Sequence, residues 1–309
     1  MSTLKPSVRE LVRVEDRISF LYVEFCVMTR DGGAVKAVRD TGTVCLPTAT
    51  VGALWLGPSV TVTHQAMSLL FERGTTVVWM GWDGLAHYGS GRPLSNKTRL
   101  LTAQAAIHTA ARKRMHCARR MYAMRFGEQA PRSATTLNKL RGYEGNRVRE
   151  VYAKYARDYG VPWNGRVFTP GELSKSDVIN QALTVAHQCL YAVISGVIQG
   201  IGAHPGLSVV HNGTQSSFVY DIADLYKTEV CVPAAFRVAR SHPTATGHDI
   251  SHLVRSEMRS NLTAERVVPQ AVKDIYALLL DEDVEADYET VDHLWDQNVH
   301  VPGGVNHGA

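Results

Sequence analysis

The chain has 309 residues, of which 45% are hydrophobic, and a formal net charge of +4 at pH 7. A chain of this length can bury a substantial core and is at the size where cores usually divide into two domains. Its 5 cysteines are widely spaced without a CxxC pair, which argues against a disulfide framework and a zinc knuckle and favours a reduced, intracellular protein. The N-terminal residues carry charges throughout and no run of 18 apolar residues occurs, so we expect a cytoplasmic protein without a membrane span.

The first 90 residues contain short apolar runs rich in Val, Ile, Thr and Phe, separated by turn residues. We expect strands at 18–28, 43–46, 53–56 and 75–80, a hairpin turn at 31–33 and a short helix at 64–71. Gly and Pro residues then concentrate at 89–93, where we place a domain boundary. The sequence therefore predicts a small β-rich N-terminal domain over residues 1–90.

Beyond this boundary, the long apolar patterns have a period near 3.6. They predict helices at 97–126, 133–159 and 175–201, a brief β-like run at 207–210, a turn at 212–213, and a helix capped by Ser216 or Ser217 that runs through Tyr226. Residues 281–309 hold 8 acidic residues and no Lys or Arg. We expect an α+β fold with an all-α C-terminal catalytic domain over residues 91–280 and an acidic, disordered tail over 281–309.

The basic residues gather in the middle of the chain. Residues 92–166 contain 17 Lys or Arg and 4 Asp or Glu, a net charge of +13. Basic helices often only present solvated faces, but an excess of this size favours binding to a polyanion. A cluster over about two helical turns is suited to phosphate contacts without sequence reading, and it predicts salt-sensitive affinity for duplex DNA. Its members are Arg112, Lys113, Arg114, Arg119 and Arg120.

Two carboxylates on the helix predicted after residue 216 are candidates for a metal site. Asp221 and Asp224 are three residues apart and follow His211 by ten and thirteen residues. Carboxylates with one imidazole suit Mg²⁺ or Mn²⁺, and the absence of cysteine argues against structural zinc. Such a pair is usually a solvated helix face, but the apolar residues around it favour burial, and a buried carboxylate needs a partner. Spacing alone does not decide which carboxylate contacts the metal.

Residues 210–224 (VHNGTQSSFVYDIAD) resemble the metal-site motif of the Cas1 family, the CRISPR-associated integrases that acquire spacers. Three further segments resemble its type I-E branch and occur in the same order, and two short ones also fit. These are 140–149 (LRGYEGNRVR), 159–166 (YGVPWNGR) and 177–183 (DVINQAL), together with 125–127 (RFG) and 16–19 (DRIS). The resemblance covers roughly residues 12 to 245.

This resemblance implies roles for individual residues. Glu144, His211 and Asp224 are implied as metal ligands and Asp221 as an acid that supports or shares the site, all four counted as catalytic. Without the resemblance, Glu144 is as easily paired with Arg141 or Arg147 one helical turn away. Thr214 stands where relatives of this branch often carry a basic residue. Further candidate contacts to DNA are Arg141 and Arg166, and for base stacking Phe25 and Phe168, which could equally be core residues.

The activity implied by the resemblance is metal-dependent transesterification. The 3′-hydroxyl of a protospacer fragment attacks a phosphodiester of the CRISPR repeat array, with Mg²⁺ or Mn²⁺ as cofactor. The resemblance also implies a homodimer through the β-rich domain, with two dimers bridged by the small partner Cas2.

Two alternatives remain open: a general metal-dependent endonuclease or junction resolvase that uses water as nucleophile, and a non-catalytic DNA-binding or assembly protein.

Overall fold

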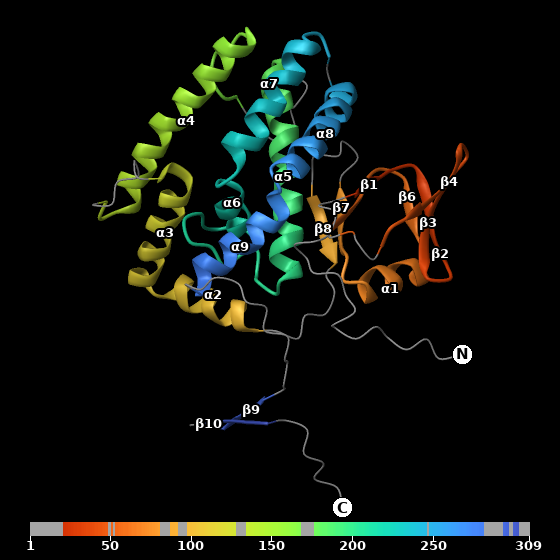
Figure 1. Cartoon of the computed structure of the whole chain (residues 1–309), viewed down its shortest axis with the longest axis horizontal. Coiled ribbons are helices and arrows are strands. Elements are labelled where there is room, and N and C mark those ends of the chain that lie inside the picture. Colours follow the sequence, from red (N-terminus) through yellow and green to blue (C-terminus); the bar gives the residue numbers. More distant parts are fainter. Residues whose placement is uncertain are drawn as a thin grey trace, which may run out of the picture.

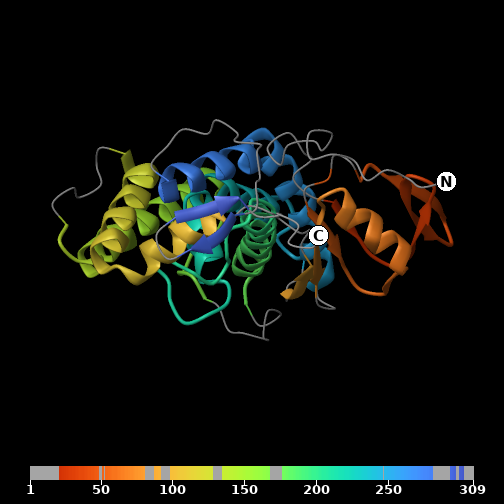
Figure 2. The ribbon, with the colours of Figure 1, turned by 90° about the horizontal axis from the view of Figure 1, so that it is seen from below.

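The protein is described here from a computed structural model. It describes residues 21–48, 51, 53–80, 87–91, 98–127, 134–167, 176–245, 247–280, 293–296 and 299–302. Figure 1 shows a strand-rich part at one end, helices over most of the rest and the hairpin of β9 (His293–Asp296) and β10 (Val299–Pro302) apart from them, and Figure 2 shows the same elements from below. The predicted α+β architecture is confirmed.

The strand-rich part contains two four-stranded sheets and one helix. The first sheet has the order β1-β5-β7-β8 and the second the order β4-β3-β2-β6. The elements are β1 (Leu21–Val23), β2 (Cys26–Asp31), β3 (Ala34–Arg39), β4 (Gly42–Leu46), β5 (Ala53–Leu56), β6 (Val60–Val62), α1 (His64–Glu72), β7 (Thr76–Met80) and β8 (His87–Gly91).

The strand expected at 18–28 is two strands in the described residues. Phe25 has a φ of 49°, in the left-handed region that extended backbone does not enter. The chain turns there and passes from one sheet to the other, because β1 pairs with β5 in parallel while β2 pairs with β3 and β6. The hairpin at Gly32 is present, and β6 and β8 were not predicted.

The first sheet separates two apolar clusters. Leu54 and Val77 face a cluster completed by α1 and the second sheet, whereas Trp55 and Val78 join the large cluster of the helices. This alternation follows from the two-residue period of a strand buried on both faces. The domain boundary near residue 90 stays a prediction.

The helical part is built around one apolar helix. Its elements are α2 (Arg99–Thr109), α3 (Ala111–Phe126), α4 (Leu137–Tyr159), α5 (Val178–Gly200), α6 (Ser217–Ala223), the π-helical turn η5 (Lys227–Cys231), α7 (Val232–Ser241), α8 (Gly247–Ala264) and α9 (Val267–Leu280). α5 begins at the N-cap Asp177, whose side chain accepts a hydrogen bond from the Asn180 N–H. By length and composition α5 could cross a membrane, but 83% of its most apolar window is buried against the surrounding helices.

Three expectations for the helical part needed correction. The helix expected at 97–126 is two helices, because Ala110 adopts an extended conformation with φ −104° and ψ 107°. The run at 207–210 is not a strand, since its polar backbone groups bind side chains instead of a neighbouring strand. The helix expected to run through Tyr226 ends at Ala223, and neither Ser216 nor Ser217 caps its N–H groups through the side chain.

Within the acidic segment 281–309 the structure describes one antiparallel hairpin of β9 (His293–Asp296) and β10 (Val299–Pro302). The rest of this segment lies outside the described residues, so its disorder stays a prediction.

Candidate metal and DNA site

Asp221 organises the loop that precedes α6. Its side chain is buried and accepts hydrogen bonds from three consecutive backbone N–H groups, those of Val209 at 2.5 Å, Val210 at 3.1 Å and His211 at 2.9 Å. These three donors satisfy the hydrogen-bonding capacity of a carboxylate that is buried away from water. Asp221, a residue of the helix that follows, therefore holds the backbone of this loop in one conformation.

The same carboxylate orients the imidazole of His211. Nδ1 of His211 lies 2.8 Å from Oδ1 of Asp221, and Nε2 lies 3.9 Å from Oδ2 of Asp224. Because the carboxylate of Asp221 accepts a hydrogen bond from Nδ1, this nitrogen carries the proton. In a neutral ring the lone pair is therefore on Nε2. The hydrogen bond to Asp221 raises the pKa of His211, partial burial opposes it, and Asp224 adds to the rise. Metal-binding histidines usually donate the N–H of the other ring nitrogen to a carboxylate, which fixes the orientation of the ring.

Two arginines hold the carbonyl side of this loop. Arg114 Nε donates to the carbonyl of Val209 at 2.6 Å, and its Nη2 donates to that of His211 at 3.3 Å. Arg141 Nη2 donates to the carbonyl of Val210 at 3.3 Å. The N–H groups of residues 209–211 thus bind one carboxylate while their carbonyls bind two guanidinium groups, which leaves His211 little freedom to move.

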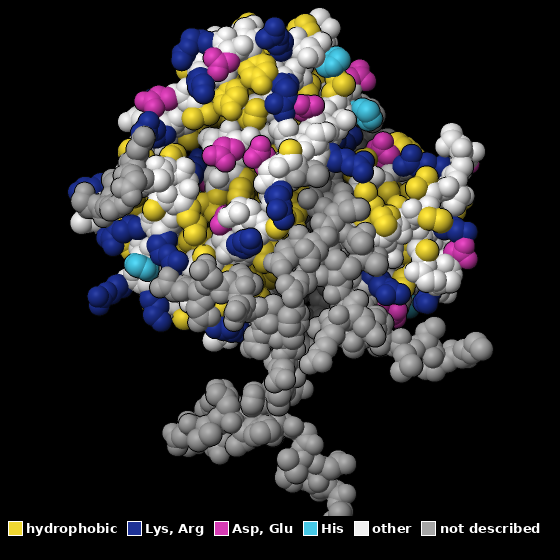
Figure 3. Space-filling model, in the orientation of Figure 1, with side chains coloured by type: hydrophobic (Ala, Val, Ile, Leu, Met, Phe, Trp, Pro, Cys, Tyr) yellow, Lys and Arg dark blue, Asp and Glu magenta, His cyan; other side chains and the backbone are white. Residues whose placement is uncertain are grey.

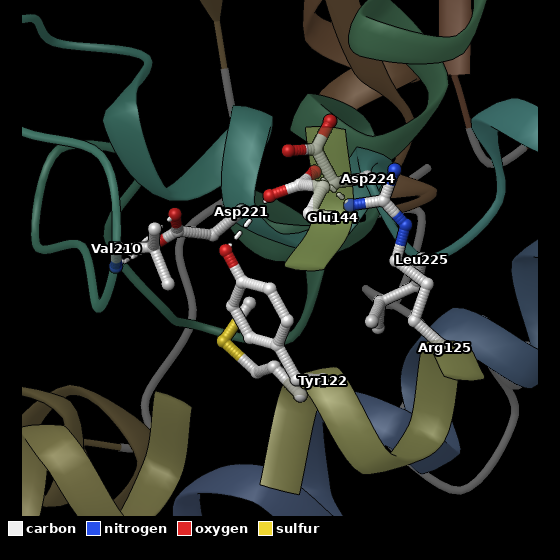
Figure 4. Close-up of a pocket in the computed structure, with 8 residues that line it drawn as sticks. Tyr122, Arg125, Glu144, Val210, Asp221, Asp224 and Leu225 are labelled. Atoms are coloured by element: carbon white, nitrogen blue, oxygen red, sulfur yellow. Dashed lines mark hydrogen bonds and ion pairs between the residues drawn. The ribbon is translucent and has the colours of Figure 1, made fainter. Parts of the chain in front are cut away.

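Glu144 reaches the same region from α4. Its Oε2 accepts a hydrogen bond from the Tyr122 hydroxyl at 2.8 Å, and its Oε1 forms an ion pair with Arg125. Both partners project from α3, as Figure 4 shows. Burial, followed by the bond to Glu144, raises the pKa of Tyr122, so its hydroxyl stays protonated as a donor. Glu144 is thus paired across two helices and not with Arg141 or Arg147 of its own helix.

Asp224 caps the C-terminus of α6 and has a cation of its own. Its Oδ1 lies 2.5 Å from Nζ of Lys227, and this Nζ also lies 4.8 Å from the centre of the Tyr191 ring. Burial alone lowers the pKa of Lys227, but Asp224 and Tyr191 outweigh it, and the pKa lies above its ordinary value. Lys227 opens the π-helical turn η5, a local irregularity that is frequent at functional sites.

The three carboxylates line one small cavity. Glu144, Asp221 and Asp224 border it together with Arg125, and its volume of about 20 Å³ is enough for about one water-sized body. Carboxylate oxygens and one imidazole fit Mg²⁺ or Mn²⁺ by type. In the described part of the chain, however, no three His, Cys, Asp or Glu side chains are arranged to hold a metal ion as they stand. The set fits in kind, and its carboxylates share the cavity, whereas His211 is not among the lining residues and reaches the site through Asp224. Arg125 and Lys227 lie beside Glu144 and Asp224.

The candidate DNA contacts on α3 fall into two groups. Arg112 and Lys113 are exposed, whereas Arg114 and Arg119 donate to backbone carbonyls, the latter to that of Ala134. Arg120 likewise donates to the carbonyl of Ala277. In Figure 3 Lys and Arg side chains gather over the side of the molecule where α2, α3 and α4 lie. A basic surface is present, and a role of any one of these residues in DNA binding stays a prediction.

Arg166, Phe25 and Thr214 are not among the residues that line the cavity. Arg166 is partly buried and donates to the side chains of Asn180 at 3.1 Å and Thr184 at 2.8 Å. Phe25 is 53% exposed in the strand-rich part, which disfavours the core alternative for it. Phe168 lies outside the described residues. Thr214 contacts Ser217 and offers no positive charge.

Sequence reasoning assigned no role to Tyr122, Arg125 or Lys227. Lys227 lies three residues after Asp224, a spacing that favours an ion pair on a helix and could have indicated this one. Arg125 stood in the RFG segment, and its position does not reveal its partner. The pairing of Arg125 with Glu144 depends on how α3 packs beside α4, which a single sequence does not encode in its spacing.

Known proteins resemble the chain over most of its length. The family described as "CRISPR associated protein Cas1" matches residues 21–131 and 123–248. The CRISPR-associated endonuclease Cas1 of Clostridium sp. (strain SY8519) is 37% identical over 297 residues, covering 96% of this chain and 97% of the relative. The Cas1 endonuclease of Escherichia coli (strain K12) is 36% identical over 267 residues, covering 86% and 87%. The crystal structure of a TtCas1-DNA complex matches with a TM-score of 0.80 and 35% identity, covering 93% of this chain and 99% of that chain.

Proposed function

The chain belongs to the Cas1 family of CRISPR-associated proteins, and we propose that it is a metal-dependent DNA integrase of CRISPR adaptation. The observation that carries the proposal is the convergence of Glu144, Asp221 and Asp224 on one cavity, with His211 oriented toward Asp224. The basic surface over α2, α3 and α4 supports DNA as the substrate. A relative solved in complex with DNA supports it independently.

The proposed reaction exchanges one phosphodiester for another. The 3′-oxygen of a protospacer end attacks a phosphorus atom of the repeat, the old bond to the repeat's 3′-oxygen breaks, and the proton of the attacking hydroxyl ends on the released 3′-hydroxyl. No covalent bond to the protein is needed. A Mg²⁺ or Mn²⁺ ion held by Glu144, His211 and Asp224 would lower the pKa of the attacking hydroxyl and offset charge on the phosphate.

The chain's own residues position this machinery. Asp221 keeps the proton of His211 on Nδ1, so that the lone pair of Nε2 remains available to bind a metal ion. Tyr122 holds one oxygen of Glu144. Arg112 and Lys113 would anchor the DNA backbone, because they are exposed on α3. Asp221 would support the site without being a ligand, since each of its oxygens already accepts at least two hydrogen bonds, whereas each oxygen of Glu144 has one partner.

We further propose the type I-E branch, a homodimer through the β-rich part, two dimers bridged by Cas2, and a cytoplasmic location. The branch follows from the resemblance of residues 140–149, 159–166 and 177–183, and the assembly follows from the resemblance to the family as a whole. The location follows from the widely spaced cysteines and the lack of a long apolar run. Co-purification of the full chain with Cas2, followed by mass determination, tests the assembly.

The activity is tested with a 3′-end-labelled, blunt DNA fragment that ends in a free 3′-hydroxyl and a supercoiled plasmid carrying a repeat array, with Mn²⁺ present. We expect label joined to plasmid, and no joining when the fragment ends in a 3′-deoxy nucleotide. The variants Glu144→Gln and Asp224→Asn should lose joining, whereas Glu150→Gln, an exposed acid on the same helix, should retain it. Nicking without joining would favour the endonuclease or resolvase alternative. Joining by Glu144→Gln at the parental rate would contradict the catalytic assignment of Glu144, and DNA binding without nicking or joining by the parental chain would favour the non-catalytic alternative.

A further inference from the structure

Two of the three proposed ligands already have a buried cation of the protein beside them. Arg125 is paired with Glu144, and its side chain is only 8% exposed. Lys227 is paired with Asp224, and its side chain is 18% exposed. Neither pair is an ordinary surface ion pair, in which both groups are well solvated and the energy is small.

Both cations are held in place by more than the carboxylate. The ammonium of Lys227 lies between Asp224 and the face of Tyr191. Arg125 has its guanidinium over the Phe126 ring at 5.0 Å from the centre. Its Nε is buried and has no hydrogen-bond acceptor among the described residues, so the group retains one unused donor beside the cavity. A buried cation is costly to leave unpaired, so both groups would remain near the site when a metal ion enters.

The charges of the site then favour a single metal ion. Glu144, Asp221 and Asp224 contribute three negative charges, and Arg125 and Lys227 offset two of them, with His211 neutral when it binds metal. One divalent ion changes the net charge from −1 to +1, which still attracts a phosphate. A second divalent ion would raise it to +3 within a cavity of about 20 Å³, where repulsion between cations is strong.

We propose that Arg125 and Lys227 are fixed cations that take the place of a second divalent ion, so that the site binds one metal ion and binds it less tightly than its carboxylates alone would. In two-metal phosphodiester enzymes the paired ions stabilise the attacking and the leaving oxygen. Here one ion and two side-chain cations would divide that task. This inference rests on the proposed function, because it assumes that Glu144 and Asp224 bind metal.

A purely structural role for the two pairs makes a different prediction. If Arg125 and Lys227 only stabilise the fold, replacing them lowers the free energy of unfolding and leaves metal affinity unchanged or weaker. If they act as competing cations, the same replacements strengthen metal binding while they slow strand joining. Metal affinity and joining rate then move in opposite directions.

The test is a Mn²⁺ titration of the metal-free full chain, with free Mn²⁺ followed by electron paramagnetic resonance. We expect one Mn²⁺ per parental chain and about tenfold or more tighter binding in Arg125→Met and in Lys227→Met, because each removes a cation near the ion. Arg125→Lys and Lys227→Arg keep the charge and should keep the parental affinity. Lys154→Met removes an exposed charge of α4, the helix of Glu144, and should change nothing.

The same proteins are then assayed for joining at saturating Mn²⁺, where both Met variants should join strands at least about tenfold more slowly. Thermal melts accompany each titration, and Arg125→Gln and Lys227→Gln replace any Met variant that does not fold. Two Mn²⁺ ions per parental chain, or unchanged or weaker binding in the folded neutral variants, would overturn the inference and leave the proposed function intact. Absence of Mn²⁺ binding by the parental chain would overturn both.

Discussion

Nδ1 of His211 lies 2.8 Å from Oδ1 of Asp221, and the same oxygen accepts the backbone N–H of His211 at 2.9 Å. One buried carboxylate therefore fixes both the ring and the backbone of the same residue. Because it also accepts the N–H groups of Val209 and Val210, its contribution to the fold and its contribution to the site are inseparable.

The variant Asp221→Asn tests this double role. An amide has one acceptor oxygen where the carboxylate has two, and its NH₂ group would face the backbone N–H groups of residues 209–211. Some of these buried N–H groups would therefore lose their hydrogen-bond acceptor. We expect the free energy of unfolding to fall by about 3 kcal/mol and Mn²⁺ affinity to fall about 10- to 100-fold. Urea unfolding of the metal-free protein and a Mn²⁺ titration measure the two effects. A fully stable variant with parental Mn²⁺ affinity would contradict the role assigned to Asp221.

The raised pKa of His211 predicts how stability depends on pH in the metal-free protein. Because the folded pKa lies above the unfolded value of about 6.5, the charged ring stabilises the fold fully below that pH. This contribution disappears as pH rises through the folded pKa. The stability advantage of the parental chain over His211→Gln should therefore be larger at pH 5.5 than at pH 9, in urea unfolding with EDTA. Mn²⁺ affinity should change in the opposite direction, since a protonated ring cannot bind metal.

Tyr122→Phe removes a single hydrogen bond from Glu144. Because the Arg125 pair remains, Glu144 should stay near the cavity but with one oxygen less well placed. We expect a loss of about 1 kcal/mol in stability, from the net value of one hydrogen bond, and a fall in the joining rate of up to about tenfold. The rate is measured under single-turnover conditions at saturating Mn²⁺. A parental rate would show that Arg125 alone positions Glu144.

Arg114→Met tests whether this residue braces the loop or binds DNA. Its guanidinium donates to the carbonyls of Val209 and His211, so its removal leaves two partly buried acceptors without a charged donor. We expect a loss of about 2 kcal/mol in the free energy of unfolding. Mn²⁺ affinity should fall as well, because His211 loses its support, while the salt dependence of DNA binding should stay the same. A flatter salt dependence with parental stability would instead assign Arg114 to the DNA interface.

The sequence allowed the fold class and the His211, Asp221 and Asp224 cluster to be predicted because their determinants are local. A period of two or 3.6 residues shows which face of an element is buried, and a residue ten positions before Asp221 can return to it through one turn. The break at Ala110 was missed because the apolar period continues across it, and the break at Phe25 because only its backbone angle reveals it.

The partners of Glu144 were not predictable from such local patterns. Tyr122 and Arg125 are 22 and 19 residues away in the chain, on another helix. The basic cluster shows the same limit: its five members look alike in sequence, yet packing leaves Arg112 and Lys113 exposed and directs Arg114, Arg119 and Arg120 onto backbone carbonyls.

This difference in exposure predicts which basic residues bind the DNA backbone. Arg112→Ala and Lys113→Ala should each weaken duplex binding about equally for unrelated sequences and reduce the slope of log affinity against log salt by about one, as expected for one lost phosphate contact. Fluorescence anisotropy at a series of salt concentrations measures the slope. Their stability in urea should match the parental chain, because both side chains are exposed. An unchanged slope in both variants would place the DNA on another face, with the exposed Arg149 and Arg157 of α4 as the next pair to replace.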